Sequence, residues 1–233
     1  MKELFSNYNI EINDKQVDKF NKYYRLLIEW NKNINLTTII NYDDVIKKHF
    51  LDSVLLLKVF TKDLFISKNI IDVGTGAGFP GLPLAIMLPD AKFTLIDSLN
   101  KRIQFLKEVV EILEIDNITL IHARAEELGI NSNYREKYDI CVSRAVAPLP
   151  LLLEYCSPFV RKEGVLYLYK SLKVEEEICS AQNALSILNC SINKNILLSV
   201  ENDFRRYILE IKKDDSIPSK YPRKPGKAKK APL

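Results

Sequence analysis

The stretch from Ile70 to Leu84, IIDVGTGAGFPGLPL, decides the fold of this chain. Its first part predicts a short strand over Asn69–Val73, and a helix is expected to begin near Pro80, where a missing N–H is tolerated. Four of the seven glycines of the chain lie in the turn between them: Gly74, Gly76, Gly78 and Gly81. Glycine is costly in backbone entropy, so this density needs a positional reason, and close approach to a ligand supplies one. The stretch therefore predicts a loop that binds a nucleoside cofactor.

Two glycine patterns overlap in this turn, and they favour different cofactors. Gly76-x-Gly78-x-x-Gly81 fits the dinucleotide pattern, with Asp97 lying 21 residues beyond Gly76 at the end of the next strand. Gly74-x-Gly76-x-Gly78 also fits, with Asp72 on the strand before it. A carboxylate there attracts the cationic amino-acid end of S-adenosylmethionine and repels a diphosphate. These residues favour S-adenosylmethionine over NAD, and a glycine turn without a ligand is the third possibility.

Length and composition limit the class of protein. A chain of 233 residues with 47% hydrophobic content suits one α/β domain with additions. It contains no apolar stretch approaching 18 residues and no signal-peptide core at its start, so we expect a cytoplasmic protein without a membrane partner. The four cysteines are scattered and the chain has two histidines, which predicts reduced core thiols and no metal site.

The positive charge of the chain is concentrated at one end. Residues 216–233 hold six Lys and Arg residues and no acid; removing these six from the total of 34 leaves 28, against 30 acidic residues. This Pro- and Lys-rich tail is either a disordered, solvated end or an arm that seeks nucleic-acid phosphate. The charge pattern favours the arm, and Tyr221 could stack on a base.

The order of predicted elements indicates a doubly wound α/β fold. Two amphipathic helices precede residue 69, one with Val17, Phe20, Tyr24, Leu27 and Ile28 on its apolar face. Two closing strands after a fifth helix suit the seven-stranded, mostly parallel sheet of a Rossmann-like class I methyltransferase. We expect an N-terminal helical extension (1–66), the methyltransferase domain (67–214) and the basic tail (215–233). The strands are expected at 70–73, 93–96, 119–121, 138–143, 165–169, 196–200 and 207–211, with the clearest helices at 100–114 and 175–188.

Further candidate contacts follow from their places in this order. Asp97 ends the second strand, where a carboxylate can accept hydrogen bonds from a ribose, although it could instead cap the next helix. Ala125 and Glu126 follow the third strand and could meet an adenine edge, or simply begin a helix. Arg144 follows the fourth strand, where it could hold a phosphate or a base. His49 has an ambiguous place on a helix, and a lone histidine there is more often structural.

Taken together, these motifs resemble the ribosomal RNA small-subunit methyltransferase G family, also called glucose-inhibited division protein B. The resemblance covers nearly the whole chain. It is carried by Asn35-Leu36-Thr37, HFLDS at 49–53, DVGTGAGFPGLPL at 72–84, Asp97-Ser98 with Lys101-Arg102, Arg124 to Glu126, Ser143-Arg144-Ala145, Lys170 and the tail.

The resemblance implies N7-methylation of one guanine in a conserved loop of 16S ribosomal RNA. By family pattern, the cofactor contacts fall on Gly74, Phe79, Ala125, Glu126 and Arg144, in addition to Asp72, Gly76, Gly78 and Asp97 from the residues themselves. Arg144, His49 and Lys170 are expected to position the substrate. The expected partner is 16S rRNA or the 30S subunit, and the expected state is a monomer.

The residues also indicate a mechanism. After the fourth strand the chain reads Ser143-Arg144-Ala145-Val146, without the acid or Asn followed by Pro-Pro-aromatic that amine methylation uses, and no cysteine ends a strand to act as a nucleophile. An acceptor with a free lone pair, such as guanine N7, then remains, so we expect no general base. Two alternatives stay open: an NAD-dependent oxidoreductase, and an RNA-binding module that transfers no methyl group.

Overall fold

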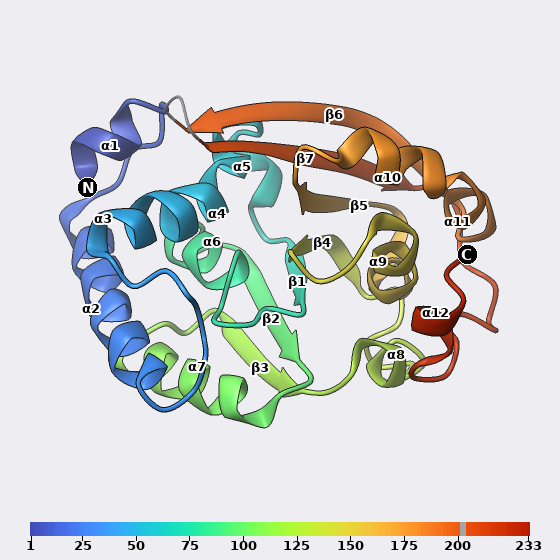
Figure 1. Cartoon of the computed structure of the whole chain (residues 1–233), viewed down its shortest axis with the longest axis horizontal. Coiled ribbons are helices and arrows are strands. Elements are labelled where there is room, and N and C mark those ends of the chain that lie inside the picture. Colours follow the sequence, from blue (N-terminus) through green and yellow to red (C-terminus); the bar gives the residue numbers. More distant parts are fainter. Residues whose placement is uncertain (201–203) are drawn as a thin grey trace.

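The computed structural model describes residues 1–200 and 204–233 and is built around one seven-stranded sheet (Figure 1). The strand order is β3-β2-β1-β4-β5-β7-β6. Strands β1 to β5 pair in parallel, and β7 runs antiparallel between β5 and β6. The expected mostly parallel sheet is confirmed. The strands are β1 (Asn69–Val73), β2 (Lys92–Asp97), β3 (Ile118–His122), β4 (Tyr138–Arg144), β5 (Val160–Lys170), β6 (Cys190–Val200) and β7 (Phe204–Lys213).

Side chains of β1 alternate between two apolar cores, one on each face of the sheet. Ile70 belongs to the core that includes helices α2, α6 and α7, whereas Ile71 and Val73 belong to the core that includes α9 and α11. Both faces of the parallel part are therefore buried, as such sheets require. The helices after β1 are α6 (Gly81–Met87), α7 (Asn100–Ile112), α8 (Ala125–Leu128), α9 (Leu149–Cys156), the 3-10 turn η3 (Ser157–Phe159), α10 (Val174–Ser180) and α11 (Gln182–Ile187).

The single helix expected over residues 175–188 is two helices, α10 and α11. The backbone of Ala181, with φ of −94° and ψ of 1°, leaves the helical region between them. Ala181 is fully buried, so packing on the sheet sets this break rather than any local breaker residue.

The N-terminal extension packs into the same core as α6 and α7. Helix α2 starts at a capping box in which Asn13 and Gln16 exchange hydrogen bonds. It buries Phe20, Tyr23, Leu26 and Leu27, so Tyr23 takes the place we expected for Tyr24. The extension consists of α1 (Lys2–Ser6), α2 (Asp14–Asn31), α3 (Tyr42–Val45), the π-helix η1 (Ile46–Leu51), α4 (Asp52–Val54), α5 (Leu56–Val59) and the 3-10 turn η2 (Lys62–Phe65).

The basic tail is folded onto the body, which makes the alternative of a disordered, solvated end wrong. Ile217 and Tyr221 are about 5% exposed and Ala228, in α12 (Lys227–Lys230), is fully buried. All three belong to or lie against the core beside α9, where Figure 1 shows the C-terminal end. The buried Tyr221 ring is not available to stack on a base. Burial of these apolar side chains therefore holds the tail on the body, although its composition is rich in Pro and Lys.

In the described part of the chain, every helix is too short or too polar to cross a bilayer. The cysteines are free thiols; Cys141, Cys156 and Cys190 are buried as expected, whereas Cys179 is exposed.

Candidate active site

The turn after β1 has a left-handed backbone at three glycines, with φ of 72° at Gly74, 61° at Gly76 and 100° at Gly78. Residues with a Cβ rarely adopt this conformation, so glycine is required there. A Cβ added at Gly76 would meet no atom within 4 Å. The backbone at Gly76 therefore faces open space that a ligand can enter.

Two of the other glycines make room for protein atoms, which corrects part of our interpretation of the loop. A Cβ at Gly74 would lie 2.6 Å from a methyl group of Val146, and one at Gly78 would collide with the hydroxyl of Tyr23. That hydroxyl donates a hydrogen bond to the Ala77 carbonyl. The density of glycine thus reflects tight packing of the loop as well as approach to a ligand.

Asp72 lies beneath the loop and is fully buried, so its side chain does not reach the ligand space as we expected. Its Oδ2 accepts hydrogen bonds from the Thr75 hydroxyl at 2.7 Å and from the Gly81 N–H at 2.8 Å. Gly81 permits this contact, because a Cβ there would lie 2.6 Å from Oδ2. Within the described residues Oδ1 has no hydrogen-bond partner, and burial raises the pKa of Asp72 to about 7. Asp72 therefore holds the loop in shape.

A cavity of about 320 Å³ lies at the carboxyl ends of β1, β2 and β4, where folds of this type bind their ligands. Four predicted cofactor contacts line it: Gly74, Asp97, Ala125 and Glu126. The other five lie outside its lining: Asp72, Gly76, Gly78, Phe79 and Arg144.

Asp97 combines both roles that the sequence left open. Its Oδ1 accepts a hydrogen bond from the Leu99 N–H at 2.9 Å, at the start of α7. Its Oδ2 accepts from the Gly76 N–H at 2.9 Å and from Arg102 at 3.2 Å. The carboxylate is 3% exposed, and lone pairs remain on its oxygens for a hydroxyl in the cavity. Asp97 thus joins the glycine loop to the wall of the cavity.

The opposite wall is formed by α8 and α9. Glu126, in α8, is 7% exposed and lies close to Tyr155 in α9. Burial, followed by the Glu126 charge, raises the pKa of Tyr155. Tyr155 was not predicted from the sequence, because its only signal is one aromatic ring in an apolar helix.

Arg144 does not line this cavity. Its guanidinium is 8% exposed and pairs with Asp52, with Nη1 2.5 Å from Oδ2. Nη1 also donates to the Lys48 carbonyl at 3.2 Å, and the group lies 4.9 Å from the centre of the Phe79 ring. Arg206, from β7, makes a second pair with Asp52 at 3.0 Å. The ends of β4 and β7 are thereby fastened to α4.

His49 lies in this same cluster, on the π-helix η1. Its ring stacks on Phe79 with centroids 4.6 Å apart. Arg144 Nη2 lies 3.2 Å from Nδ1, and arginine only donates, so Nδ1 accepts and Nε2–H donates to the Thr37 hydroxyl at 2.8 Å. Burial, with help from the Arg144 charge, lowers the pKa of His49 to about 4. His49 is therefore neutral at pH 7, with both ring nitrogens engaged.

A second cavity, of about 460 Å³, lies next to the first and contains Lys170 in its lining. The Lys170 ammonium donates to the Ala147 carbonyl at 3.0 Å and pairs with Glu177. Ala145 and Val146 line both cavities, so the two spaces meet at the end of β4. The arrangement offers one chamber for a cofactor and an adjoining one for an acceptor group.

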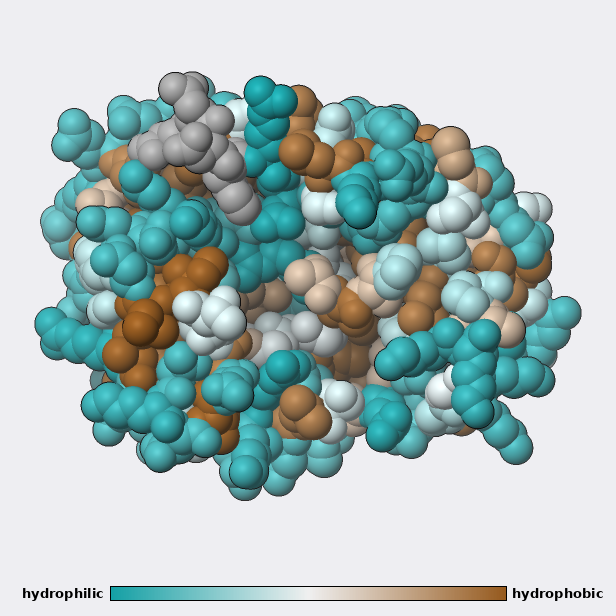
Figure 2. All heavy atoms as spheres, viewed as in Figure 1, coloured by the Kyte–Doolittle hydropathy of each residue, from teal (hydrophilic) through white to brown (hydrophobic). Residues whose placement is uncertain are grey.

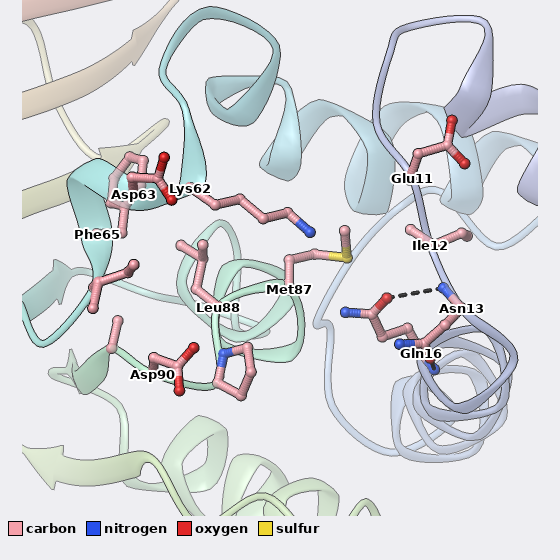
Figure 3. A pocket seen from close by; sticks show the side chains of 13 residues that line it. Glu11, Ile12, Asn13, Gln16, Lys62, Asp63, Phe65, Met87, Leu88 and Asp90 are labelled. Atoms are coloured by element: carbon pink, nitrogen blue, oxygen red, sulfur yellow. Dashed lines mark hydrogen bonds between the residues drawn. The ribbon is translucent and has the colours of Figure 1, made fainter.

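A third cavity, of about 530 Å³, lies at the other edge of the sheet (Figure 3). Its lining comes from the residues before β1 and β2 and from the start of α2, including Phe65, Met87 and Gln16. The Gln16 side-chain amide donates to the Ile86 carbonyl at 3.1 Å. Although larger, this cavity is far from the glycine loop and the carboxylates at the strand ends, so we do not assign the reaction to it.

Comparison with known proteins gives a consistent result. A family model described as rRNA small subunit methyltransferase G matches residues 16–205. Ribosomal RNA small subunit methyltransferase G of Acetivibrio thermocellus is 46% identical over 229 residues, covering 98% of this chain and 93% of that protein. The proteins of that name from Alkaliphilus oremlandii and Lactococcus lactis are 45% and 44% identical, over 100% and 98% of this chain and 97% and 95% of theirs.

Solved structures with lower identity share the fold. Magnesium protoporphyrin IX methyltransferase from Synechocystis, solved with bound SAM, is 18% identical with a TM-score of 0.58, covering 86% of this chain and 98% of that one. TYW2 of M. jannaschii, in complex with AdoMet, is 14% identical with a TM-score of 0.53, covering 75% and 77%.

Proposed function

The chain belongs to the ribosomal RNA small subunit methyltransferase G family, and from this premise we propose that it methylates N7 of a guanine in small-subunit rRNA with S-adenosylmethionine as donor. The observation that carries the proposal is the junction of two cavities at Ala145 and Val146. A methyl transfer needs donor and acceptor in contact, and adjoining cavities allow that.

The residues around the first cavity fit the donor. Asp97 and Glu126 supply carboxylates at the places where a ribose and an adenine edge need acceptors. The open side of Gly76 allows close approach, and the buried Asp72 places a carboxylate under the loop, which suits a cationic ligand. When bound, S-adenosylmethionine supplies a methyl group on a positively charged sulfur. Ala125, at the start of α8, is proposed to offer its N–H to the adenine.

On the acceptor side, the reaction requires mainly that the guanine be correctly positioned. Guanine N7 has a free lone pair and loses no proton on methylation. The neutral His49, with both nitrogens bonded, is unsuited to act as a base, which supports the expected absence of base catalysis. Arg144 and His49 are proposed to shape the acceptor chamber through the buried cluster. Lys170 is proposed to do so by holding the loop at Ala147.

A single incubation tests the proposal. Naked 16S rRNA and 30S particles are each incubated with donor labelled in the methyl group. We expect label in the RNA, and reduction followed by aniline is expected to cut it at one guanine, because N7-methylguanine carries a fixed positive charge. RNA already methylated with unlabelled donor is the control and should take up no label.

Three outcomes would contradict the proposal. Label in an RNA that aniline does not cut would mean a different acceptor atom. Binding of RNA without any transfer would favour a non-catalytic binding module. A fluorescence change with NADH, and none with S-adenosylmethionine, would favour the oxidoreductase.

A further inference from the structure

The C-terminal segment, residues 216–233, presents a set of exposed lysines that the proposed reaction does not use. We call them the lysine face: Lys220, Lys224, Lys227, Lys229 and Lys230. The segment contains no acidic side chain that could offset their charge. Figure 2 shows hydrophilic side chains gathered over the part of the molecule where Figure 1 places α8 and α12.

An ion pair fixes the middle of the segment to α9. Arg223 Nη2 lies 2.5 Å from Glu154 Oε2, and its Nε and backbone N–H both donate to Oε1, at 2.9 and 2.8 Å. Glu154 is fully buried, so this pair is shielded from water. The one arginine of the segment is therefore occupied in docking, and the lysines are left facing outward.

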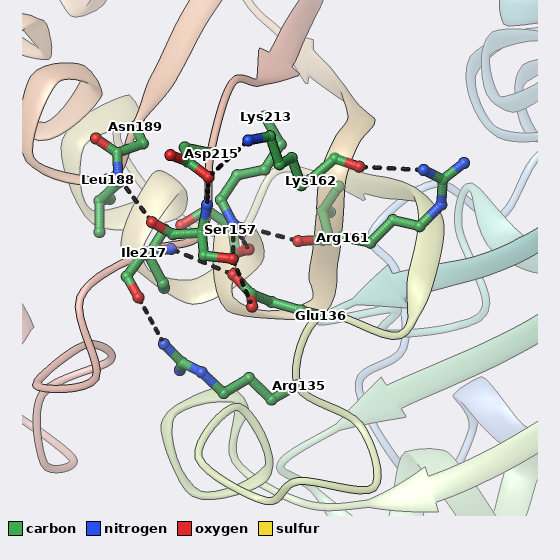
Figure 4. A network of polar contacts seen from close by, with 12 residues as sticks. Arg135, Glu136, Ser157, Arg161, Lys162, Leu188, Asn189, Lys213, Asp215 and Ile217 are labelled. Carbon is green, nitrogen blue, oxygen red and sulfur yellow. Dashed lines mark hydrogen bonds and ion pairs between the residues drawn. The ribbon is translucent and has the colours of Figure 1, made fainter.

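A polar network holds the start of the segment, as Figure 4 shows. The Arg135 guanidinium donates to the carbonyls of Tyr221 at 2.7 Å and Ile217 at 3.2 Å. Glu136 accepts from the Ile217 N–H at 3.2 Å and from the fully buried Lys213 at 3.1 Å. The lysine face is thus part of the folded structure.

The segment also touches the walls of the cofactor cavity. Pro222 lies against Gly129, directly after α8, which carries Glu126. Glu154, the partner of Arg223, is next to the cavity residue Tyr155. The segment that carries the lysine face therefore packs against α8 and α9, the helices that contribute Glu126 and Tyr155 to the cavity.

We propose that the lysine face is a preformed surface that binds phosphate groups of the rRNA substrate next to the reaction site; this inference rests on the proposed function. Five exposed lysines in a segment without acidic side chains match a polyanion. Protein partners are bound mostly through apolar centres, but among the described residues the exposed large apolar side chains lie outside this segment. Because the segment is already ordered, binding costs less conformational entropy than ordering a free arm would.

The test replaces the five lysines of the face with glutamine and measures binding of 16S rRNA across a range of salt concentrations. The slope of log K against log salt should fall by about 0.7 for each phosphate of single-stranded RNA that a lysine no longer neutralises. A matched control replaces five exposed lysines elsewhere: Lys15, Lys32, Lys62, Lys92 and Lys107. It should keep the wild-type slope. Equal slopes in wild type and the face variant would overturn the inference.

Two further measurements distinguish a failure of the surface proposal from a failure of the proposed function, and test whether the surface is preformed. If the wild type methylates RNA but the face variant keeps its slope, the surface proposal fails and the proposed function stands; if the wild type methylates no RNA, the proposed function fails. Amide hydrogen exchange tests the preformed state. Residues 217–228 should be protected in the free protein, and protection that arises only with RNA would contradict a preformed surface.

Discussion

The Arg144 guanidinium and the Asp52 carboxylate form a buried ion pair that joins the end of β4 to α4, with Nη1 2.5 Å from Oδ2. Arg206 completes the arrangement, since its Nε lies 3.0 Å from Oδ1 and its Nη2 3.1 Å from Oδ2. Both oxygens of Asp52 are therefore engaged, and the carboxylate is fully buried. One buried carboxylate thus holds two arginines that come from different strands of the sheet.

Asp52→Asn should destabilise the protein strongly, because it removes a fully buried carboxylate that pairs with the buried Arg144 and also contacts Arg206. We expect the free energy of unfolding to fall by about 3–5 kcal/mol, measured by urea denaturation. The control is Asp18→Asn, which removes an exposed pair with Lys22 and should cost less than about 1 kcal/mol. Equal effects of the two changes would mean that the buried pair contributes no more than a surface one.

Asp97→Ala should weaken binding of S-adenosylmethionine by about 1–3 kcal/mol, because ribose donors would be left without an acceptor. Calorimetry measures this as a roughly 5- to 150-fold rise in Kd. The melting temperature without donor should also fall, since Gly76 and Leu99 lose an acceptor. Asp116→Ala, an exposed acid at the other edge of the sheet, is the matched control. Unchanged affinity in Asp97→Ala would mean that Asp97 has a structural role only and does not bind the donor.

Donor affinity should rise as pH increases through about 7. Burial raises the pKa of Asp72 to about 7, so the group is largely protonated below that pH and ionised above it. A cationic ligand favours the ionised form, so its Kd should fall by up to about tenfold per pH unit below the pKa. The amino group of the ligand titrates too, and Asp72→Asn controls for it. Identical pH profiles of the two proteins would show that Asp72 does not sense the ligand.

The rate of a single turnover at saturating donor and RNA should be nearly flat from neutral to mildly alkaline pH. His49 has a pKa of about 4 and already lacks a proton throughout that range, so its titration contributes no rising limb. Rapid-quench measurements with labelled donor give the rate. His49→Gln should leave the shape of the profile unchanged. A tenfold rise per pH unit that disappears in His49→Gln would instead identify His49 as a base.

Local patterns predicted the parallel sheet well. Short apolar runs such as Ile70–Val73, bounded by turn residues, become strands because both faces of the sheet are covered. The place of β7 between β5 and β6 is a matter of long-range pairing, such as Leu166 with Ile211, and no local signal carries it. The buried face of α2 was predicted one position off at Tyr23, since periodicity fixes a face only to within about a residue.

The residues of the candidate site also fall into those that local sequence patterns predict and those that depend on long-range contacts. Asp97 and Glu126 could be predicted because the order of elements along the chain brings the carboxyl ends of the parallel strands together at one side of the sheet. The partners of Asp52 lie 92 and 154 residues away, so Arg144 was assigned to a ligand and Arg206 was overlooked. The signal for Arg206 was a pair of arginines directly before the apolar run 207–209. In the tail, charge was given more weight than Ile217, Tyr221 and Ala228, the residues that dock it.

Because the chain is synthesised from its N-terminus, the parts of the fold are completed in a fixed order. A ribosome makes β1 to β5 and the whole glycine loop before it makes Arg206 and the segment from Ser216 onward. A nascent chain lacking these parts exposes Glu154 without Arg223 and holds Asp52 with one arginine instead of two. Translation that stops before residue 216 therefore yields a product without the Arg223–Glu154 ion pair and without the lysine face.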